Sequence, residues 1–189
     1  MANVNHSSLT DPYLHEPKGV ASANNGEVYI ANGSGSGNWK ELSRYVNGYV
    51  TFDAVSPYAY QHAVTTGYTP LNPTFSLEAT NGFTATASPN ARLTYVGDEN
   101  IIGPVNFTLS YKNDSGSNKD VELVFYKNGS VMNGGHIIVT AVSGQWSVAT
   151  LTDLTSLSTN DYVEVFVKGP SAFTLDIASA SLTILGVPN

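Results

Sequence analysis

The sequence of 189 residues contains no cysteine. Disulfides and cysteine-ligated zinc sites are therefore excluded, and packing, hydrogen bonds or oligomerisation must hold the fold together. Charge is also scarce. Only 12% of the residues are charged, and 8 Lys and Arg against 15 Asp and Glu leave a net charge of -7. Nucleic-acid-binding proteins usually carry a basic patch, and anionic membranes attract basic proteins. We therefore expect no nucleic acid and no membrane among the partners.

Long apolar runs are missing as well. No stretch of the sequence approaches the roughly 18 apolar residues that a membrane-spanning helix needs. The first 19 residues have neither the positively charged start nor the apolar centre of a secretory signal. The sequence predicts a soluble protein that is made in a cytoplasm.

Motifs for catalysis, phosphate binding and metal binding are not found. The stretch Gly33–Gly37 lacks the Lys-Ser/Thr that completes a P-loop, and no G-x-S-x-G elbow is present. The histidines have no second ligand at a recognised metal spacing; they are His6, His15, His62 and His136. The loop acids lack the calcium-loop pattern; they are Asp98, Glu99, Asp114 and Asp120. We predict no enzyme, no metal and no cofactor. The sequence does not exclude the paired carboxylates of a glycosidase, because the fold can bring together two acids that are far apart in the sequence.

What the sequence does contain is a dense pattern of strands and turns from about residue 49 onward. The stretches Val105–Tyr111 and Tyr162–Val167 alternate apolar and other residues, which is typical of strands with one buried face. Asn128-Gly129 predicts a tight hairpin turn. We expect residues 136–142 and 145–149 to pair about Ser143-Gly144, and residues 151–157 to have room for one helical turn. No long amphipathic helix is visible.

Eight or more short strands with turns between them predict an all-β antiparallel sandwich or barrel. We favour a jelly-roll β-sandwich over residues 49–189. Inward-facing residues from several strands would fill its core; they are Val163, Val165, Val167, Phe107, Leu109 and Leu123. We expect Asp161 to cap a turn and Glu164 to face solvent or a neighbouring subunit. Periodicity alone does not fix the order of the strands.

Residues 1–48 form an extended N-terminal arm in this interpretation. Two short apolar pieces, Glu27–Ala31 and Trp39–Leu42, flank a Gly/Ser stretch. We favour a small hairpin because an aromatic residue stands on each side, Tyr29 and Trp39, although the Gly/Ser stretch could equally be a flexible linker. The arm has too few apolar residues for a core of its own. It is therefore either disordered or ordered against a partner, and we favour a partner surface.

Two stretches resemble known families. Leu157–Val167, followed by Ala180–Ile184, resembles the closing strands of TNF/C1q-like jelly-roll domains, and Tyr111 and Phe125–Gly129 fit the middle strands. The resemblance covers roughly residues 75 to 187. It implies a homotrimer with an aromatic-rich face around the three-fold axis, and the chain has 11 Tyr and 7 Phe. The candidates for this interface are Tyr58, Tyr60, Tyr68, Tyr95, Tyr126 and Phe166, any of which could instead line the core or an exposed face.

The arm, over Leu9–Val20 and Val28–Gly37, resembles N-terminal segments of tailed-phage virion proteins, particularly capsid decoration and head-fibre proteins. This resemblance implies a non-enzymatic trimer made in the host cytoplasm and placed on the capsid exterior, with the major capsid protein as partner. The arm residues that would bind the capsid are Tyr13, Leu14, His15, Pro17, Val20, Val28, Tyr29, Ile30 and Trp39. Three arms on one trimer would bind together, which multiplies weak contacts.

An alternative is a tail-associated receptor- or carbohydrate-binding jelly-roll module, with a host-surface glycan as partner. Exposed Tyr and Trp would then stack on sugars. Trp146 could do this, although we expect it to lie in the core. A jelly-roll enzyme, such as a polysaccharide depolymerase, is the least supported alternative because no catalytic constellation is visible.

Overall fold

The computed structural model describes residues 23–24, 27–31, 34, 37–41, 45–54, 60–85 and 91–189. These residues form strands and turns, and none of them lies in a helix. Within this described part, no helix could cross a membrane. The chain divides into two compact units, Met1–Arg44 and Tyr45–Asn189.

The N-terminal unit contains the predicted hairpin. Strands β1 (Glu27–Ala31) and β2 (Gly37–Glu41) pair antiparallel, with Tyr29 opposite Trp39. The two rings meet edge to face, with 5.5 Å between their centroids. This geometry is favoured for aromatic pairs and stabilises the strand pairing. The hairpin is therefore confirmed over the flexible linker.

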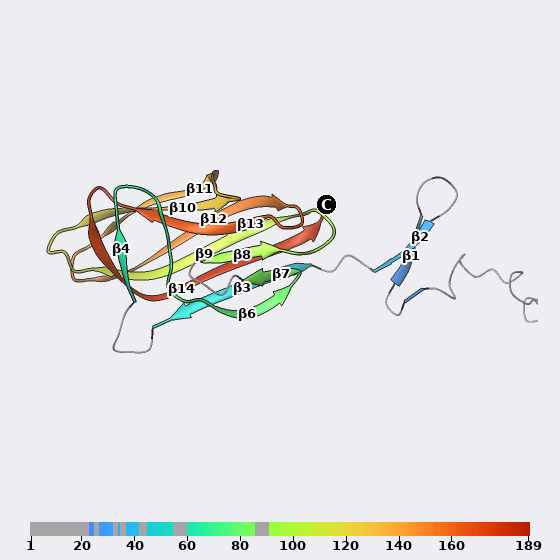
Figure 1. Ribbon diagram of the computed structural model, residues 1–189, viewed down its shortest axis with the longest axis horizontal. Coiled ribbons are helices and arrows are strands. Elements are labelled where there is room, and N and C mark those ends of the chain that lie inside the picture. Colours follow the sequence, from blue (N-terminus) through green and yellow to red (C-terminus); the bar gives the residue numbers. More distant parts are fainter. Residues whose placement is uncertain are drawn as a thin grey trace, which may run out of the picture. The chain divides into compact units, whose positions relative to one another are not determined.

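The second unit is a sandwich of two antiparallel sheets, whose strands apart from the short β5 are labelled in Figure 1. Sheet I has the order β12-β9-β14-β3-β6, with β4 also pairing β14; its strands are β3 (Val46–Asp53), β4 (Tyr60–Val64), β6 (Ser76–Asn81), β9 (Ile101–Asn113), β12 (Trp146–Leu157) and β14 (Phe173–Pro188). Sheet II has the order β11-β10-β13-β8-β7, with β5 also pairing β13; its strands are β5 (Thr69–Pro70), β7 (Phe83–Ala85), β8 (Arg92–Tyr95), β10 (Lys119–Lys127), β11 (Ser130–Ala141) and β13 (Tyr162–Lys168).

The strand order is that of a jelly-roll. When the short strands β4 to β7 are set aside, the remaining eight strands of the sandwich follow in chain order as β3, β8, β9, β10, β11, β12, β13 and β14. Sheet I then holds the sixth, third, eighth and first of them, and sheet II the fifth, fourth, seventh and second. This interleaving of two Greek keys defines the double-sheet jelly-roll. The predicted fold is confirmed.

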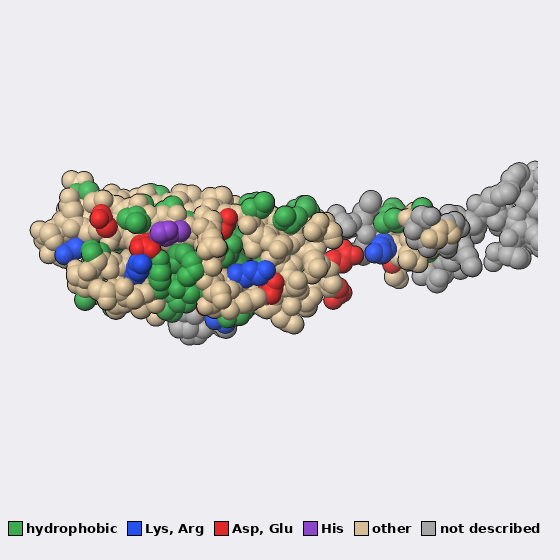
Figure 2. Space-filling view, turned by 90° about the horizontal axis from the view of Figure 1, so that it is seen from above, with side chains coloured by type: hydrophobic (Ala, Val, Ile, Leu, Met, Phe, Trp, Pro, Cys, Tyr) green, Lys and Arg blue, Asp and Glu red, His purple; other side chains and the backbone are tan. Residues whose placement is uncertain are grey.

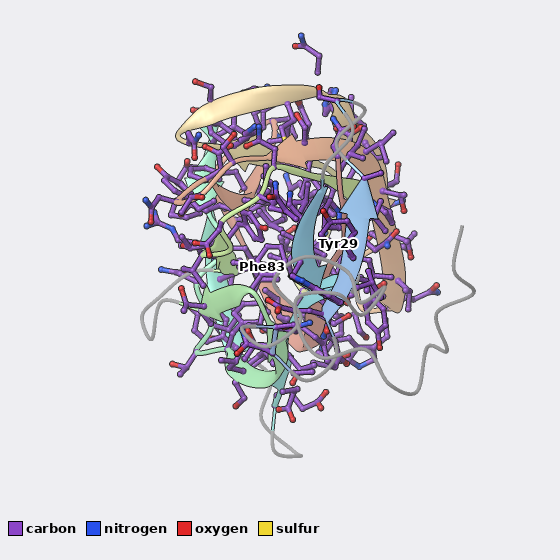
Figure 3. The ribbon with its side chains drawn as sticks, turned by 90° about the vertical axis from the view of Figure 1, so that its right-hand side faces the viewer. Tyr29 and Phe83 are labelled. Atoms are coloured by element: carbon purple, nitrogen blue, oxygen red, sulfur yellow. The ribbon has the colours of Figure 1, made fainter. Side chains whose placement is uncertain are left out.

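The core lies between the two sheets and consists of the inward residues of the alternating strands. All six predicted core residues, from Phe107 to Val167, are fully buried. Phe83 of β7 lies among the interior side chains and packs against Tyr95 of β8 (Figure 3). Strand β3 begins at Val46, within the last residues of the predicted arm. Gly48 occupies a buried position of β3 where the alternation calls for an apolar side chain. A side chain does not fit there, because a Cβ would lie 2.8 Å from the Phe83 ring.

Two local predictions concerning β12 are wrong. Residues 151–157 hold no helical turn, because β12 pairs with β9 from Trp146 opposite Lys112 to Leu157 opposite Ile101. The segments around Ser143-Gly144 do not form a hairpin either, because β11 belongs to sheet II and β12 to sheet I. The turn at Asn128-Gly129 is confirmed. Its φ angles of 51° and 77° are those of the two-residue turn that joins β10 to β11.

Candidate binding surfaces

Exposed apolar side chains gather at one end of the outer face of sheet I. Ile102 of β9 lies opposite Val187 of β14, and Leu154 of β12 lies opposite Pro104 of β9, so neighbouring strands contribute to one continuous surface. We call it the apolar patch; its residues are Tyr45, Ile102, Pro104, Leu154, Leu185 and Val187. A groove of about 310 Å³ runs across it between β9 and β14. Leu154 is the most exposed apolar strand residue of the patch, at 64%.

The apolar patch follows from strands that are apolar on both sides. In β9 and β14, Ile101 and Ile184 fill the core while the next residues, Ile102 and Leu185, point outward. Gly103 lets the two strands approach closely, since a Cβ at this position would lie 1.8 Å from the Leu185 carbonyl oxygen. Polar side chains adjoin the patch on the same face, for example where Thr152 donates a hydrogen bond to Asn106.

Trp146 lies at the opposite end of the same face. It is 51% exposed, so the expectation that it lies in the core is wrong. The inward positions of β12 belong to Ala149 and Leu151, and the two-residue period therefore turns Trp146 and Val148 outward. The Lys112 ammonium lies 5.5 Å from the centroid of the Trp146 ring, within range of a cation–π interaction.

The outer face of sheet II carries an aromatic cluster. The rings of Tyr126 and Phe166 stack with 4.0 Å between their centroids, and the ring of Tyr68 meets Tyr126 edge-on at 5.9 Å. Val124 points outward between the core residues Leu123 and Phe125, yet it is fully buried. It lies opposite Phe166 on one side and His136 on the other. Side chains on this face therefore form a second, smaller apolar layer outside the main core.

Glu122 joins a group of polar side chains beside this cluster. Its carboxylate accepts hydrogen bonds from the Tyr68 hydroxyl and from Lys168 Nζ at 3.0 Å, and it lies 2.8 Å from His136 Nε2. The Lys168 ammonium also lies 4.3 Å from the centroid of the Tyr68 ring. In Figure 2, charged side chains and a histidine border a cluster of hydrophobic side chains.

The contacts of Glu122 fix its charge. Burial by itself would raise the pKa of this carboxyl, but hydrogen bonds from Tyr68 and Lys168 and the charges of Lys168 and His136 hold the pKa below its ordinary value. The hydrogen bond to Glu122 raises the pKa of Lys168. Burial and the hydrogen bond to Glu122 raise the pKa of Tyr68. At neutral pH the group therefore contains a carboxylate, an ammonium and a neutral phenol.

The six aromatic residues predicted for the trimer interface do not all meet in one surface. Tyr68, Tyr126 and Phe166 come together on sheet II, whereas Tyr60 lies on β4 and donates a hydrogen bond to Asn72 at 2.9 Å. The expectation that Tyr95 contacts another subunit is wrong, because its ring is buried in the core of its own chain. Tyr58 lies outside the described residues, as do the arm residues Tyr13, Leu14, His15, Pro17 and Val20.

The arm residues that the structure describes belong to the hairpin. Val28, Tyr29 and Trp39 are half-buried, and Ile30 is exposed.

Asp161 caps its turn as predicted, since it accepts a hydrogen bond from the Ser158 backbone N–H at 2.9 Å.

Glu164 does not face solvent or a neighbouring subunit, and this expectation is wrong. It is only 3% exposed. Arg92 Nε and Nη2 both donate to its Oε1, at 2.9 and 2.7 Å. The Arg92 guanidinium in turn lies 4.2 Å from the centroid of the Tyr162 ring. The charge is therefore neutralised within its own sheet.

His62 is a buried titratable group of sheet I. Its Nδ1 lies 3.1 Å from Asn72 Oδ1, and its buried Nε2 has no hydrogen-bond partner among the described residues. Burial lowers the pKa of His62, and the contact with Asn72 offsets this in part. In the described ranges, histidines and acids do not form a group of three or more that could hold a metal ion.

Sequence and structure comparisons differ in what they find. No family model matches the chain, and no curated protein sequence matches it. Murine APRIL at pH 5.0 is similar in structure, at 10% identity over 75% of this chain and 98% of that chain, with a TM-score of 0.47. Eiger TNF from S. frugiperda is similar at 8% identity over 74% and 91%, with a TM-score of 0.44. The PRD1 vertex protein P5 is similar at 11% identity over 76% and 97%, with a TM-score of 0.46.

Proposed function

We propose that this chain is a structural protein of a tailed-phage virion, a homotrimeric decoration or head-fibre protein that stands on the major capsid shell. The observation that carries this proposal is the apolar patch on sheet I. An exposed continuous apolar surface is typical of a protein–protein interface rather than of a face that stays in water. Closed cyclic symmetry matches the three-fold positions of a capsid.

The apolar patch supports self-association energetically. Burying a side chain such as Leu154, which is 64% exposed, contributes on the order of 1 to 2 kcal/mol, and the patch contains several side chains of this kind. Closed cyclic symmetry places the patch of each subunit against its neighbour, so each such contribution recurs at every interface of the ring.

The hairpin supports the anchoring role. An isolated two-stranded hairpin is at best marginally stable in water. Strands β1 and β2 have five residues each, and Ile30 is exposed on one of them. A partner surface would stabilise the hairpin, by strand addition or by accepting its apolar side chains in a groove. We assign this partner surface to the major capsid protein.

The oligomeric state of the full chain tests self-association. Native mass spectrometry should give three chains of 20.0 kDa, about 60 kDa. Leu154→Glu should shift the mass to the monomer because it places three charges in the interfaces. Ile138→Glu is the matched control, since Ile138 is 62% exposed but lies on sheet II. A wild-type monomer, or loss of the trimer in both variants, would contradict the proposal.

Binding to particles tests the anchor. Tyr29→Ala combined with Trp39→Ala removes the aromatic pair of the hairpin. This double variant of the full chain should no longer bind capsids that were assembled without this protein. Asn38→Ala, at an exposed position of β2 next to Trp39, should leave binding unchanged. If the double variant binds capsids as the wild type does, the hairpin is not the anchor.

A second candidate function is a tail-associated receptor- or carbohydrate-binding module. One observation favours it: a cleft lined by charged and apolar side chains lies beside Glu122 on sheet II. Copy number in purified virions separates the two functions, because a head decoration protein is present in many copies and a tail protein in few.

A further inference from the structure

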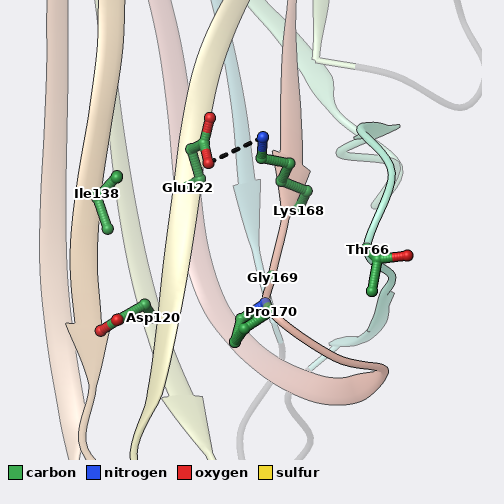
Figure 4. A pocket seen from close by; sticks show the side chains of 7 residues that line it. All are labelled: Thr66, Asp120, Glu122, Ile138, Lys168, Gly169 and Pro170. Atoms are coloured by element: carbon green, nitrogen blue, oxygen red, sulfur yellow. Dashed lines mark ion pairs between the residues drawn. The ribbon is translucent and has the colours of Figure 1, made fainter.

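A cleft of about 390 Å³ opens on the outer face of sheet II (Figure 4). Its lining residues come from β10, β11, the end of β13 and the loop before β5; they are Thr66, Asp120, Glu122, Ile138, Lys168, Gly169 and Pro170. Small-molecule sites are typically concavities of about 300 to 1,000 Å³ that combine apolar walls with a few placed polar groups. The cleft has the size and the mixture of such a site.

The polar groups of the cleft stand in a fixed row. Lys168 of β13 lies opposite Glu122 of β10, and Glu122 lies opposite Ile138 of β11. Asp120 is two residues before Glu122 on the same side of β10 and accepts a hydrogen bond from the Thr140 hydroxyl at 2.8 Å. Two carboxylates and one ammonium are thus offered side by side, which places hydrogen-bond acceptors next to a donor.

Contacts within the chain hold the walls of the cleft. Lys168 of β13, His136 of β11 and Tyr68 of the loop before β5 hold the Glu122 carboxylate, so its orientation is set within the chain. The opposite wall is fixed by the backbone, because the Gly169 N–H donates to the Thr65 carbonyl at 2.9 Å. Such preorganisation reduces the ordering entropy that a ligand would otherwise have to overcome.

Apolar walls flank this polar row. Ile138 is 62% exposed on one side and Pro170 is exposed on the other. A sugar ring has the complementary pattern, since its hydroxyl groups form a polar edge and its C–H groups an apolar face. The two carboxylates outnumber the single lysine of the cleft, and the whole chain has a net charge of -7. An acidic sugar would therefore be repelled, whereas a neutral one would not.

We propose that this cleft binds a neutral saccharide unit, whose hydroxyl groups donate to Asp120 and Glu122 and accept from Lys168 while its C–H face packs against Ile138. The site lies within a single chain and does not depend on the proposed trimer or on the virion. On a virion, it would bind a glycan of the host surface. Repetition of the site on each subunit would raise a weak affinity through avidity.

Saturation-transfer NMR on the full chain tests the site. The probes are methyl glycosides of glucose, galactose, mannose and N-acetylglucosamine, with glucuronic acid and sialic acid as the acidic comparison. We expect a signal from at least one neutral glycoside and none from the acids. No signal from any neutral glycoside, or a stronger signal from the acids, would overturn the proposal.

Variants then place the binding in the cleft. Asp120→Asn and Ile138→Ala should each weaken the affinity for the bound glycoside at least about tenfold, because each removes one contact of an exposed side chain. Asp114→Asn is the control at an exposed carboxylate outside the cleft and should bind as the wild type does. Circular dichroism melts show whether each variant is folded. Equal affinity of folded Asp120→Asn, Ile138→Ala and wild-type protein would overturn the proposal.

The same samples separate this proposal from the trimer. Leu154→Glu should lose the trimeric mass and keep the monomeric affinity for the glycoside. Asp120→Asn should keep the trimeric mass and lose affinity. Loss of affinity in Leu154→Glu, with the fold intact, would mean that the site needs the subunit interface and would contradict a site within one chain.

Discussion

Breaking the Arg92–Glu164 ion pair should destabilise the sandwich, and removing Arg92 should cost more stability than removing Glu164. The side chain of Glu164 is 4% exposed and that of Arg92 is 30% exposed. Arg92→Met leaves the carboxylate buried without its guanidinium partner. Removing one partner of a buried pair costs about 3 to 5 kcal/mol. Because Arg92 is partly solvated in the folded protein, we expect the lower end of this range, about 3 kcal/mol.

The reverse variant should be milder. Glu164→Leu leaves Arg92 able to reach water, and a leucine suits a buried position in β13. We therefore expect a loss below about 1 kcal/mol. The double variant should recover most of the stability that Arg92→Met loses, because no buried charge remains.

Urea unfolding at one fixed protein concentration measures these differences, since self-association couples stability to concentration. Lys127→Met is the matched control: Lys127 is 29% exposed, and its partner Asp161 is 19% exposed. Loss of this more solvated pair should cost at most about 1 kcal/mol. The reasoning is refuted if Arg92→Met costs no more than Lys127→Met, or if the double variant is as unstable as Arg92→Met.

Two further predictions concern sheet I. Burial lowers the pKa of His62 in the folded protein below its ordinary value of 6.5, so the unfolded chain binds the proton more readily. The contribution of neutral His62 to folding stability is therefore fully present above pH 6.5. It is lost as the pH falls toward the folded-state pKa. Urea midpoints between pH 5 and 8 should show this slope, and it should flatten in His62→Gln; an unchanged slope would contradict it. Gly103→Ala should cost at least about 2 kcal/mol, because its Cβ would meet the Leu185 carbonyl, whereas Gly67→Ala has open space and should be neutral in the same assay. Equal stability of the two glycine variants would show that β9 and β14 can separate at this point.

Much of the fold follows from the two-residue period. Val163, Val165 and Val167 are inward because a strand with alternating apolar residues buries one side, and Asn128-Gly129 turns because both residues accept positive φ. The period does not say which strand lies next to which. The link at Ser143-Gly144 therefore looks like a hairpin in the sequence, although the chain crosses there from one sheet to the other.

The candidate surfaces were harder to predict for the same reason. Adjacent apolar residues such as Ile101-Ile102 and Ile184-Leu185 signal a strand that is apolar on both sides, and this signal could have located the apolar patch. Glu164 looks like a solvent-facing residue because it stands between Val163 and Val165, which both point into the core. Its burial depends on Arg92, 72 residues away, and no local pattern records that contact.

The presence and position of the protein in purified virions is the most direct test of the proposed role. Cryo-electron microscopy of purified virions, with this protein labelled by an antibody fragment, should show the label over the head, on projections with three-fold symmetry. A label confined to the tail, or virions that lack the protein, would contradict a decoration or head-fibre role.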